Sequence, residues 1–180
     1  MKKEIMIYAV LLGVLAGGSV AWAGNPVFKD ARDGKKYKTA KIGEQEWMAE
    51  NLNYKAANSF CYKDKSANCT KYGRLYVWSA AMKACPSGWH LPTKEEYETL
   101  LKIEGFDSLL KINLPAGFRN DEGRFYPNEG NFASFWNSTE FDKDGAFTTY
   151  VGYDEDGVFV SSYQPDYNKG FAFSVRCIKD

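Results

Sequence analysis

The first half of the chain alternates short hydrophobic runs with polar turns, a pattern typical of β-hairpins. Hydrophobic and β-branched residues in segments 27–32 and 36–42 flank Asp33-Gly34. This dipeptide between two such runs is a strong hairpin signal. A further short extended segment is expected at 46–49. The stretch 55–71 is mostly polar and lacks a periodic hydrophobic pattern, so we expect a loop there.

The second half predicts an antiparallel meander, because aromatic and β-branched runs recur between acidic turns that end in glycine. The runs are 147–151, 158–160 and 171–178, and the turns end at Gly123, Gly145 and Gly157. No internal repeat, linker or low-complexity tract interrupts this alternation, which is typical of one domain.

A short helix is expected at 79–84. Ser79 is a suitable N-cap residue, because its hydroxyl can accept a hydrogen bond from an exposed amide of the first turn. Pro86 follows Cys85 and would end the helix.

A second helix is expected to begin after Thr93. Thr93 and Glu96 form a capping box, in which each side chain binds the other residue's backbone amide. A hydrophobic stripe at helical spacing follows and ends before Gly105; it consists of Tyr97, Leu100, Leu101 and Ile103. Two early helices followed by strands predict an α+β fold with a twisted antiparallel sheet.

The N-terminal segment predicts a secretory signal peptide. Two lysines precede an apolar run over 5–15 that is short for a membrane span, and Ala21 and Ala23 fit the small-residue rule for cleavage. An uncleaved membrane anchor is the alternative. We expect residues 1–23 to be removed and residues 24–180 to form a single exported domain, either secreted, periplasmic or at the cell surface. No membrane span is expected after cleavage.

The cysteines agree with export. Cys61, Cys69, Cys85 and Cys177 are an even number in a chain bound for an oxidising compartment, which indicates two disulfides. Of the three pairings, we favour a short Cys61–Cys69 loop and a long Cys85–Cys177 bridge from mid-domain to the last strand. Zinc is the competing interpretation, but no cysteine pair has the spacing of a zinc site.

Composition and charge exclude some partners. Hydrophobic residues make up 44% and aromatic residues 16% of the 180 residues, which excludes a disordered chain. The 23 basic residues are balanced by 23 acidic ones, so we expect no nucleic-acid partner and no attraction to anionic lipid.

Several phrases are too specific for composition to explain. They are Asp33-Gly34-Lys35, Trp47-Met48-Ala49-Glu50-Asn51-Leu52-Asn53, Tyr72-Gly73-Arg74-Leu75-Tyr76, Cys85-Pro86-Ser87-Gly88-Trp89-His90-Leu91-Pro92-Thr93, Ala116-Gly117-Phe118-Arg119, Phe135-Trp136-Asn137-Ser138 and Ser174-Val175-Arg176-Cys177. Together they closely resemble the Fibrobacter succinogenes major paralogous domain over residues 28–180. The resemblance implies an exported bacterial surface or secreted protein with a C-type-lectin-like fold, and it implies no defined biochemical role.

The segment 88–97 is also distantly similar to the helix start of formylglycine-generating, sulfatase-modifying enzymes, whose fold is a variant of the same class. Those enzymes use a closely spaced reactive cysteine pair near the C-terminal end. This chain has only Cys177 there, so no catalytic position is carried over.

Metal and catalytic signatures are weak. The acidic turns at 142–145 and 154–157 lack the alternating ligands and distal glutamate of a calcium loop. Gln164-Pro165-Asp166 resembles a lectin calcium motif, but its companion Trp136-Asn137-Ser138 precedes it and lacks the aspartate. His90, the only histidine, has no nucleophile partner in a motif and is expected to be a hydrogen-bonded packing residue. The carboxylate pairs 95–96 and 154/156 could be proposed as a glycosidase pair, but closeness in sequence does not give the distance between two carboxylates across a substrate. We therefore assign no metal, cofactor or catalytic residue.

The aromatic residues are the better functional clue. Most of the tryptophans should be buried in the core; these are Trp47, Trp78, Trp89 and Trp136. Tyrosines in the later loops are expected to reach solvent, where their rings can stack on the apolar faces of sugars. The candidate ligand-binding residues are Tyr126, Tyr153, Tyr163 and Tyr167.

Three functions are compatible with the sequence. The first is a non-enzymatic ligand-binding or adhesion module of the bacterial cell surface, with carbohydrate as the ligand and residues 118–169 as the binding region. The second is a structural or protein-interaction component of the cell envelope. The third is a divergent envelope enzyme. Carboxylates that converge in a cleft and have strongly shifted pKa values would favour this function.

Overall fold

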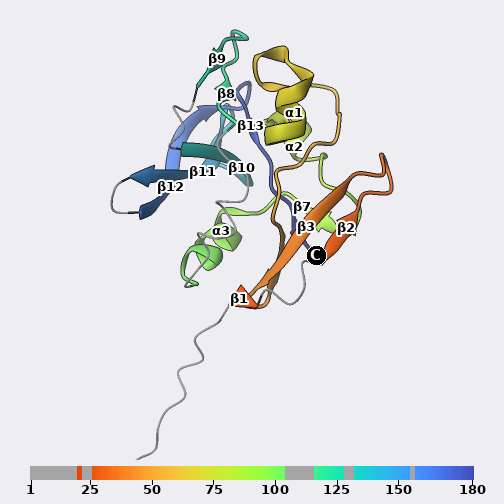
Figure 1. Cartoon of the computed structure of the whole chain (residues 1–180). Coiled ribbons are helices and arrows are strands. Elements are labelled where there is room, and N and C mark those ends of the chain that lie inside the picture. Colours follow the sequence, from red (N-terminus) through yellow and green to blue (C-terminus); the bar gives the residue numbers. More distant parts are fainter. Residues whose placement is uncertain (1–19, 22–25, 104–115, 128–131, 155–156) are drawn as a thin grey trace, which may run out of the picture.

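A computed structural model describes residues 20–21, 26–103, 116–127, 132–154 and 157–180 (Figure 1). For residues 20–21, 132, 152–154 and 157–166 the description covers the backbone alone. The fold is α+β, with short helices and two curled, largely antiparallel sheets. The expected signal peptide lies mostly outside the described residues. No helix in the described part of the chain is long and apolar enough to cross a membrane.

The first sheet has the strand order β1-β3-β4-β14-β7, with β2 paired to β3. Its strands are β1 (Val20–Ala21), β2 (Val27–Lys29), β3 (Lys36–Ile42), β4 (Gln45–Met48), β7 (Trp89–His90) and β14 (Ile178–Lys179). The expected hairpin forms, with Phe28 opposite Tyr37. Its first strand ends at Lys29 rather than at residue 32, because Asp30 turns inward and binds Arg32.

The second sheet has the order β12-β11-β10-β13-β6-β5, and β8 pairs with both β13 and β9. Its strands are β5 (Ser59–Phe60), β6 (Leu75–Val77), β8 (Phe118–Arg119), β9 (Phe125–Tyr126), β10 (Phe132–Glu140), β11 (Gly145–Asp154), β12 (Gly157–Asn168) and β13 (Ala172–Ser174). The expected meander forms from β10, β11 and β12. The expectation of purely antiparallel pairing was wrong at β13, which returns beside β10 in parallel through Phe135 and Ser174.

Three α-helices lie in the described residues, one more than expected. They are α1 (Ser66–Tyr72), α2 (Trp78–Ala81) and α3 (Lys94–Leu101), and a 3₁₀ turn, η1 (Tyr62–Asp64), precedes α1. The expectation of a loop over 55–71 was wrong for residues 66–71, which form most of α1. One buried residue, Cys69, anchors α1, so its sequence has no hydrophobic stripe that could predict a helix.

The expected helix ends were corrected by the structure. The first predicted helix, α2, begins at Trp78 with Val77 as its N-cap residue, so Ser79 does not cap it. The second, α3, begins as expected, with both hydrogen bonds of the Thr93/Glu96 capping box present. It ends at Leu101 instead of reaching Gly105, which lies outside the described residues.

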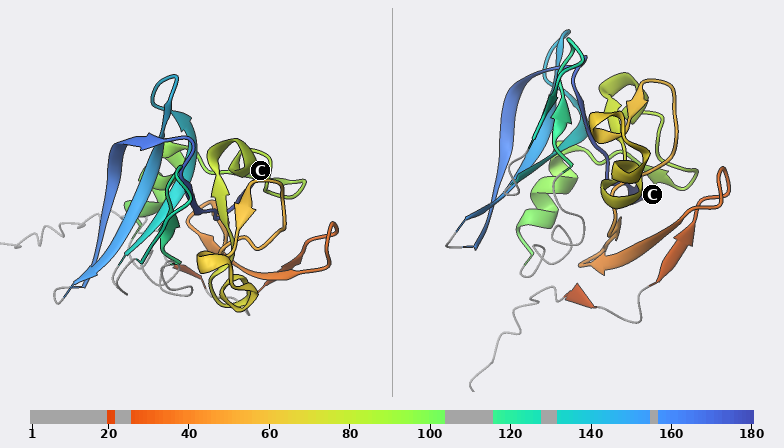
Figure 2. Two further views of the ribbon diagram at one scale, coloured as in Figure 1. Left: turned by 90° about the horizontal axis from the view of Figure 1, so that it is seen from above. Right: turned by 45° about the horizontal axis from the view of Figure 1, so that its top comes forward.

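Helix α3 packs its buried side chains between the two sheets. Tyr97 and Leu100 join Trp47 from β4 and Phe135 and Val151 from the second sheet in one core cluster. In Figure 2 the long strands β10 to β12 twist away on one side and the β2–β3 hairpin extends on the other. The tryptophan prediction holds for Trp47, Trp136 and Trp89, which are buried.

The C-terminal segment joins the two sheets. Ser174 is the last residue of β13 and Ile178 the first of β14, so residues 175–177 cross from one sheet to the other. Their carbonyls accept hydrogen bonds from Leu52 and Met48, at 2.8 and 2.9 Å. The fully buried Arg176 donates to Asn51 Oδ1 at 2.7 Å and lies over the Phe135 ring.

Both favoured disulfides are present. Cys61 is bonded to Cys69, eight residues away, and Cys85 is bonded to Cys177 across 92 residues. All four sulfurs are therefore used, which contradicts the zinc interpretation. The long bridge fixes the C-terminal segment to the chain just before β7.

The long disulfide should stabilise the fold more than the short one. In the loop-entropy model, closing about 90 residues contributes about 4.5 kcal/mol and closing about eight residues about 2.5 kcal/mol. We expect the variant Cys85→Ala/Cys177→Ala to lose about 2 kcal/mol more free energy of unfolding than Cys61→Ala/Cys69→Ala. Urea denaturation of both double variants measures this difference. Equal losses would show that the long bridge does not constrain the unfolded chain as the topology implies.

His90 links β7 to α3 and to the C-terminal strand. Its Nε2 lies 2.9 Å from Glu96 Oε1, and its Nδ1 lies 2.7 Å from Asp180 Oδ1. Partial burial opposes the charge of the imidazole, but hydrogen bonds to Asp180 and Glu96 outweigh it and raise the pKa of His90. This confirms the hydrogen-bonded role expected from the sequence.

Because the folded pKa of His90 is raised, protonated His90 should stabilise the fold at low pH. This contribution is complete below the unfolded pKa of about 6.5 and is lost as pH rises through the higher folded value. We expect His90→Gln to remove it, at a cost below about 1 kcal/mol because the side chain is partly exposed. Urea denaturation between about pH 5.5 and about pH 8.5 measures this, with Glu95→Gln as the control. A wild-type pH dependence identical to that of His90→Gln would refute the role.

Candidate functional site

Four aromatic side chains from β8, β9, β12 and the residue before β13 form a continuous group, which we call the aromatic stack: Tyr126, Phe118, Phe171 and Tyr167. The rings of Phe118 and Tyr126 are 5.0 Å apart and only 10° from parallel. Phe118 stacks on Phe171 at 6.2 Å with the same interplanar angle, and Phe171 contacts Tyr167 at 5.7 Å. Tyr126 is the exposed end of the stack, with 39% of its surface accessible.

The stack rests on the hydrophobic core through one fully buried ring. Phe173 contacts Phe118 at 5.6 Å and Tyr167 at 4.8 Å. On its other side Phe173 packs edge-on against Trp136, which is also fully buried. The exposed tyrosine is therefore held by a continuous series of ring contacts from the core to the surface.

The hairpin of β8 and β9 places Phe118 beside Tyr126. The two residues are directly paired across the hairpin, and Arg119 next to them pairs with Ala172 of β13. The buried Asn120 closes the turn, because its side chain and its backbone amide both bind the backbone of Arg124.

Gly117 allows β8 to lie close to the backbone of β9 and to the Tyr62 ring. Its φ of +70° favours glycine, and a Cβ there would lie 2.5 Å from the carbonyl oxygen of Tyr126 and 2.6 Å from the Tyr62 ring. The hairpin also carries charged side chains. Arg119 lies over the Phe60 ring at 4.1 Å, and Arg124 pairs with Glu122 at the surface.

The structure thus brings two of the four candidate tyrosines, Tyr126 and Tyr167, into one group. Tyr153 and Tyr163 lie on β11 and β12, and their side chains are outside the described part of the structure. The same holds for Gln164-Pro165-Asp166. Sequence reasoning missed Phe118 and Phe171; the phrase Ala116-Gly117-Phe118-Arg119 was the signal that could have found the first.

The acidic turn at 142–145 is explained by its own hydrogen bonds. Asp142 Oδ1 accepts from the amides of Asp144 and Gly145, at 2.9 and 2.7 Å, and these bonds lower the pKa of the carboxyl group. Of the second turn, Asp156 is outside the described residues. The described part of the chain contains no group of three potential metal ligands.

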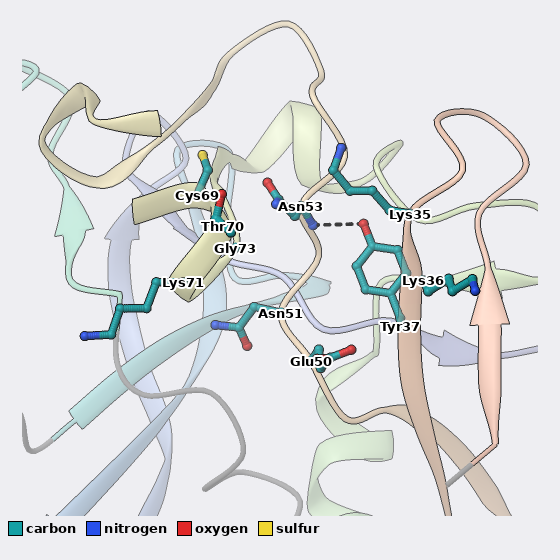
Figure 3. Close-up of a pocket in the computed structure, with 10 residues that line it drawn as sticks. All are labelled: Lys35, Lys36, Tyr37, Glu50, Asn51, Asn53, Cys69, Thr70, Lys71 and Gly73. Atoms are coloured by element: carbon teal, nitrogen blue, oxygen red, sulfur yellow. Dashed lines mark hydrogen bonds between the residues drawn. The ribbon is translucent and has the colours of Figure 1, made fainter. Parts of the chain in front are cut away.

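A polar pocket of about 160 Å³ lies between β3, segment 50–53 and the end of α1 (Figure 3). It collects residues from three of the phrases that carry the family resemblance; they are Lys35, Glu50, Asn51, Asn53 and Gly73, with Lys36, Tyr37, Cys69, Thr70 and Lys71 completing the lining. Gly73 is needed there, because a Cβ would lie 2.7 Å from Asn51.

Most polar groups of this pocket are engaged in holding the fold. The Tyr37 hydroxyl accepts from the amide of Asn53, as the dashed line in Figure 3 shows. Asn51 donates to the Tyr72 carbonyl, and Glu50 accepts from the amide of Lys38. Burial raises the pKa of Tyr37 to about 12, so its hydroxyl stays protonated and cannot act as a base near neutral pH.

The molecule is therefore a disulfide-bonded α+β domain with a supported aromatic surface and a polar pocket of mainly structural hydrogen bonds. The family described as the Fibrobacter succinogenes major domain matches residues 40–109. This match supports the resemblance over residues 40–109, which contain the polar pocket apart from Lys35, Lys36 and Tyr37. The aromatic stack lies outside the matched range. No curated protein and no solved structure matches the chain.

Gly117→Ala should disrupt the stack and destabilise the fold. The added methyl group would overlap backbone and ring atoms that cannot move freely. Gly88→Ala is the matched control, because Gly88 has a similar φ of +80° with no atom within 4 Å of its Cβ position. We expect the control to lose about 1 kcal/mol of unfolding free energy from backbone strain and Gly117→Ala at least about 2 kcal/mol more. Equal losses in urea denaturation would contradict the close approach.

Proposed function

We propose that the protein is an exported, non-enzymatic binding or adhesion module of the bacterial cell surface, which binds carbohydrate through the aromatic stack. The observation that carries the proposal is the exposed Tyr126 ring fixed on Phe118, with Phe171 behind it. A C-type-lectin-like arrangement fits the few helices, the curled sheets and the two disulfides.

Sugar rings present apolar C–H faces, and an aromatic ring can cover such a face without losing hydrogen bonds. Tyrosine supplies this contact at low entropic cost, because it has few rotatable bonds. The stack lowers the cost further, since Phe118, itself stacked on Phe171, already holds Tyr126 in one orientation before a ligand arrives. The hydroxyl of Tyr126 and the charged side chains of Glu122 and Arg124, in the turn of the same hairpin, can bind sugar hydroxyls.

The chemistry of the described titratable groups favours binding over catalysis. His90 is held between two carboxylates, and Tyr37 stays protonated. Glu96 is engaged in the helix cap, which leaves it poorly suited as a general acid. These side chains therefore serve the fold.

Two disulfides support the export part of the proposal, because such bonds form in oxidising compartments. The N-terminal segment supports it further through the features of a signal peptide. A location at the bacterial surface is supported by the resemblance, which implies an exported surface or secreted protein.

Binding to a panel of plant and bacterial polysaccharides tests this function. We expect Tyr126→Ala to weaken glycan binding at least about tenfold, which corresponds to about 1.4 kcal/mol. Phe141→Ala is the matched control, because Phe141 is an exposed aromatic residue, at 48% accessibility, outside the stack. Each measurement is repeated with calcium and with a chelator, and we expect no difference between the two.

Absence of binding to every glycan would contradict the proposal and favour a protein partner in the envelope. Equal loss in Tyr126→Ala and Phe141→Ala would show that the stack is not the site. Circular dichroism of both variants establishes that they are folded.

A further inference from the structure

The aromatic stack belongs to the second sheet, whereas a second cavity lies on the first sheet. It is on the face of that sheet that points away from helix α3. It is an open groove of about 380 Å³, which we call the outer groove, between β2 and the turn before β7. The size falls in the range of small-molecule sites. In Figure 1 its strands β2, β3 and β7 lie near the C-terminal end of the chain, away from β8 and β9.

The floor of the outer groove is a row of polar side chains across neighbouring strands. Glu46 lies opposite Lys41 of β3, and Lys179 of β14 lies opposite Trp89 of β7. Lys179 Nζ donates to Glu46 Oε2 at 2.7 Å, and the Thr39 hydroxyl donates to Glu46 Oε1 at 3.1 Å. The hydrogen bond from Lys179 lowers the pKa of Glu46, so the floor carries an ionised carboxylate paired with an ammonium group.

The walls of the outer groove are largely apolar. Phe28 and Trp89 contact each other with ring centroids 5.1 Å apart and planes tilted by 54°. Val27 is 55% exposed and also lines the groove. Ser87 and Gly88 form the other wall, where the Gly88 carbonyl binds the amide of Asp180.

Trp89 differs from the other tryptophans whose side chains the structure describes. The indole N–H groups of Trp47, Trp78 and Trp136 each donate a hydrogen bond, to Gln45, Asn137 and Tyr76. Trp89 is 7% exposed and lines the groove; its N–H donates to no other described residue, and it is not among the buried polar atoms that lack a partner. This N–H therefore reaches solvent, and it is a donor available to a ligand on a residue that lines the groove.

We propose that the outer groove binds one neutral sugar unit of pyranose size. Its hydroxyls would accept from the Trp89 N–H and the Lys179 ammonium group and donate to the Glu46 carboxylate. A neutral ligand leaves the Glu46–Lys179 ion pair intact, whereas a charged one would compete with it for one of the two partners. The apolar face of the ring would lie against Phe28 and Val27.

This inference goes beyond the function proposed above. None of its residues belongs to the aromatic stack, so either site can be present without the other. A module with both sites would bind two units of a glycan, or two chains, at separate places.

The indole signals in a ¹H–¹⁵N correlation spectrum test the proposal on the protein as recovered from expression of the full chain. The probes are the methyl pyranosides of glucose, galactose, mannose and xylose, each added to about 50 mM because a site of this size binds weakly. Trp89→Phe assigns its indole signal, and contacts to the Phe28 ring assign it if that variant does not fold.

We expect at least one pyranoside to shift the Trp89 indole signal in a saturable way, while the signals of Trp47, Trp78 and Trp136 stay in place. Lys179→Met should abolish the shift, and Tyr126→Ala should leave it unchanged. The proposal is overturned if no pyranoside moves the Trp89 signal. It is also overturned if sodium acetate shifts the signal and the sugars do not, since the ligand would then be an anion.

Discussion

The crossing of the C-terminal segment between the two sheets is the constraint on which the rest of the structure depends. Residues 175–177 accept backbone hydrogen bonds from the end of β4 and from the segment after it, while Cys177 is bonded to Cys85 ahead of β7. Between them Arg176 is fully buried, bound to Asn51 and placed over Phe135. A buried guanidinium is costly without partners, so the sheets can pack in this way only when those groups are in place.

Both candidate sites are supported by the ends of this segment. Phe173 lies in β13, just before the crossing, and contacts the rings of Phe118 and Tyr167. Lys179 lies at its end and forms the floor of the outer groove with Glu46. The phrase Ser174-Val175-Arg176-Cys177, which contributes to the family resemblance, therefore positions both surfaces without lining either of them. Residues of such a phrase can be required for binding while contacting no ligand.

The parts that could be predicted from sequence are those set by local chemistry. The capping box at Thr93, the hairpin at Asp33-Gly34 and the oxidised cysteines depend on nearby residues or on residue type. Helix α1 could not be predicted, because its one buried side chain is the disulfide-bonded Cys69. Tyr126 was recognised as a candidate, but its support by Phe171 arises from the pairing of β8 with β13 across more than fifty positions. Glu46 and Lys179 are separated by 133 residues, so no local pattern indicates their groove.

The central claim is that Tyr126 is an exposed ring, oriented in advance by its neighbours, that a glycan covers on binding. Photochemically induced nuclear polarisation detects solvent-exposed tyrosine rings by NMR and therefore tests this claim directly. We predict a polarised signal from Tyr126 in the free protein that disappears when a bound polysaccharide is added, while any signal from the partly exposed Tyr72, outside the stack, is unchanged. A Tyr126 signal that persists in the saturated complex would contradict the account.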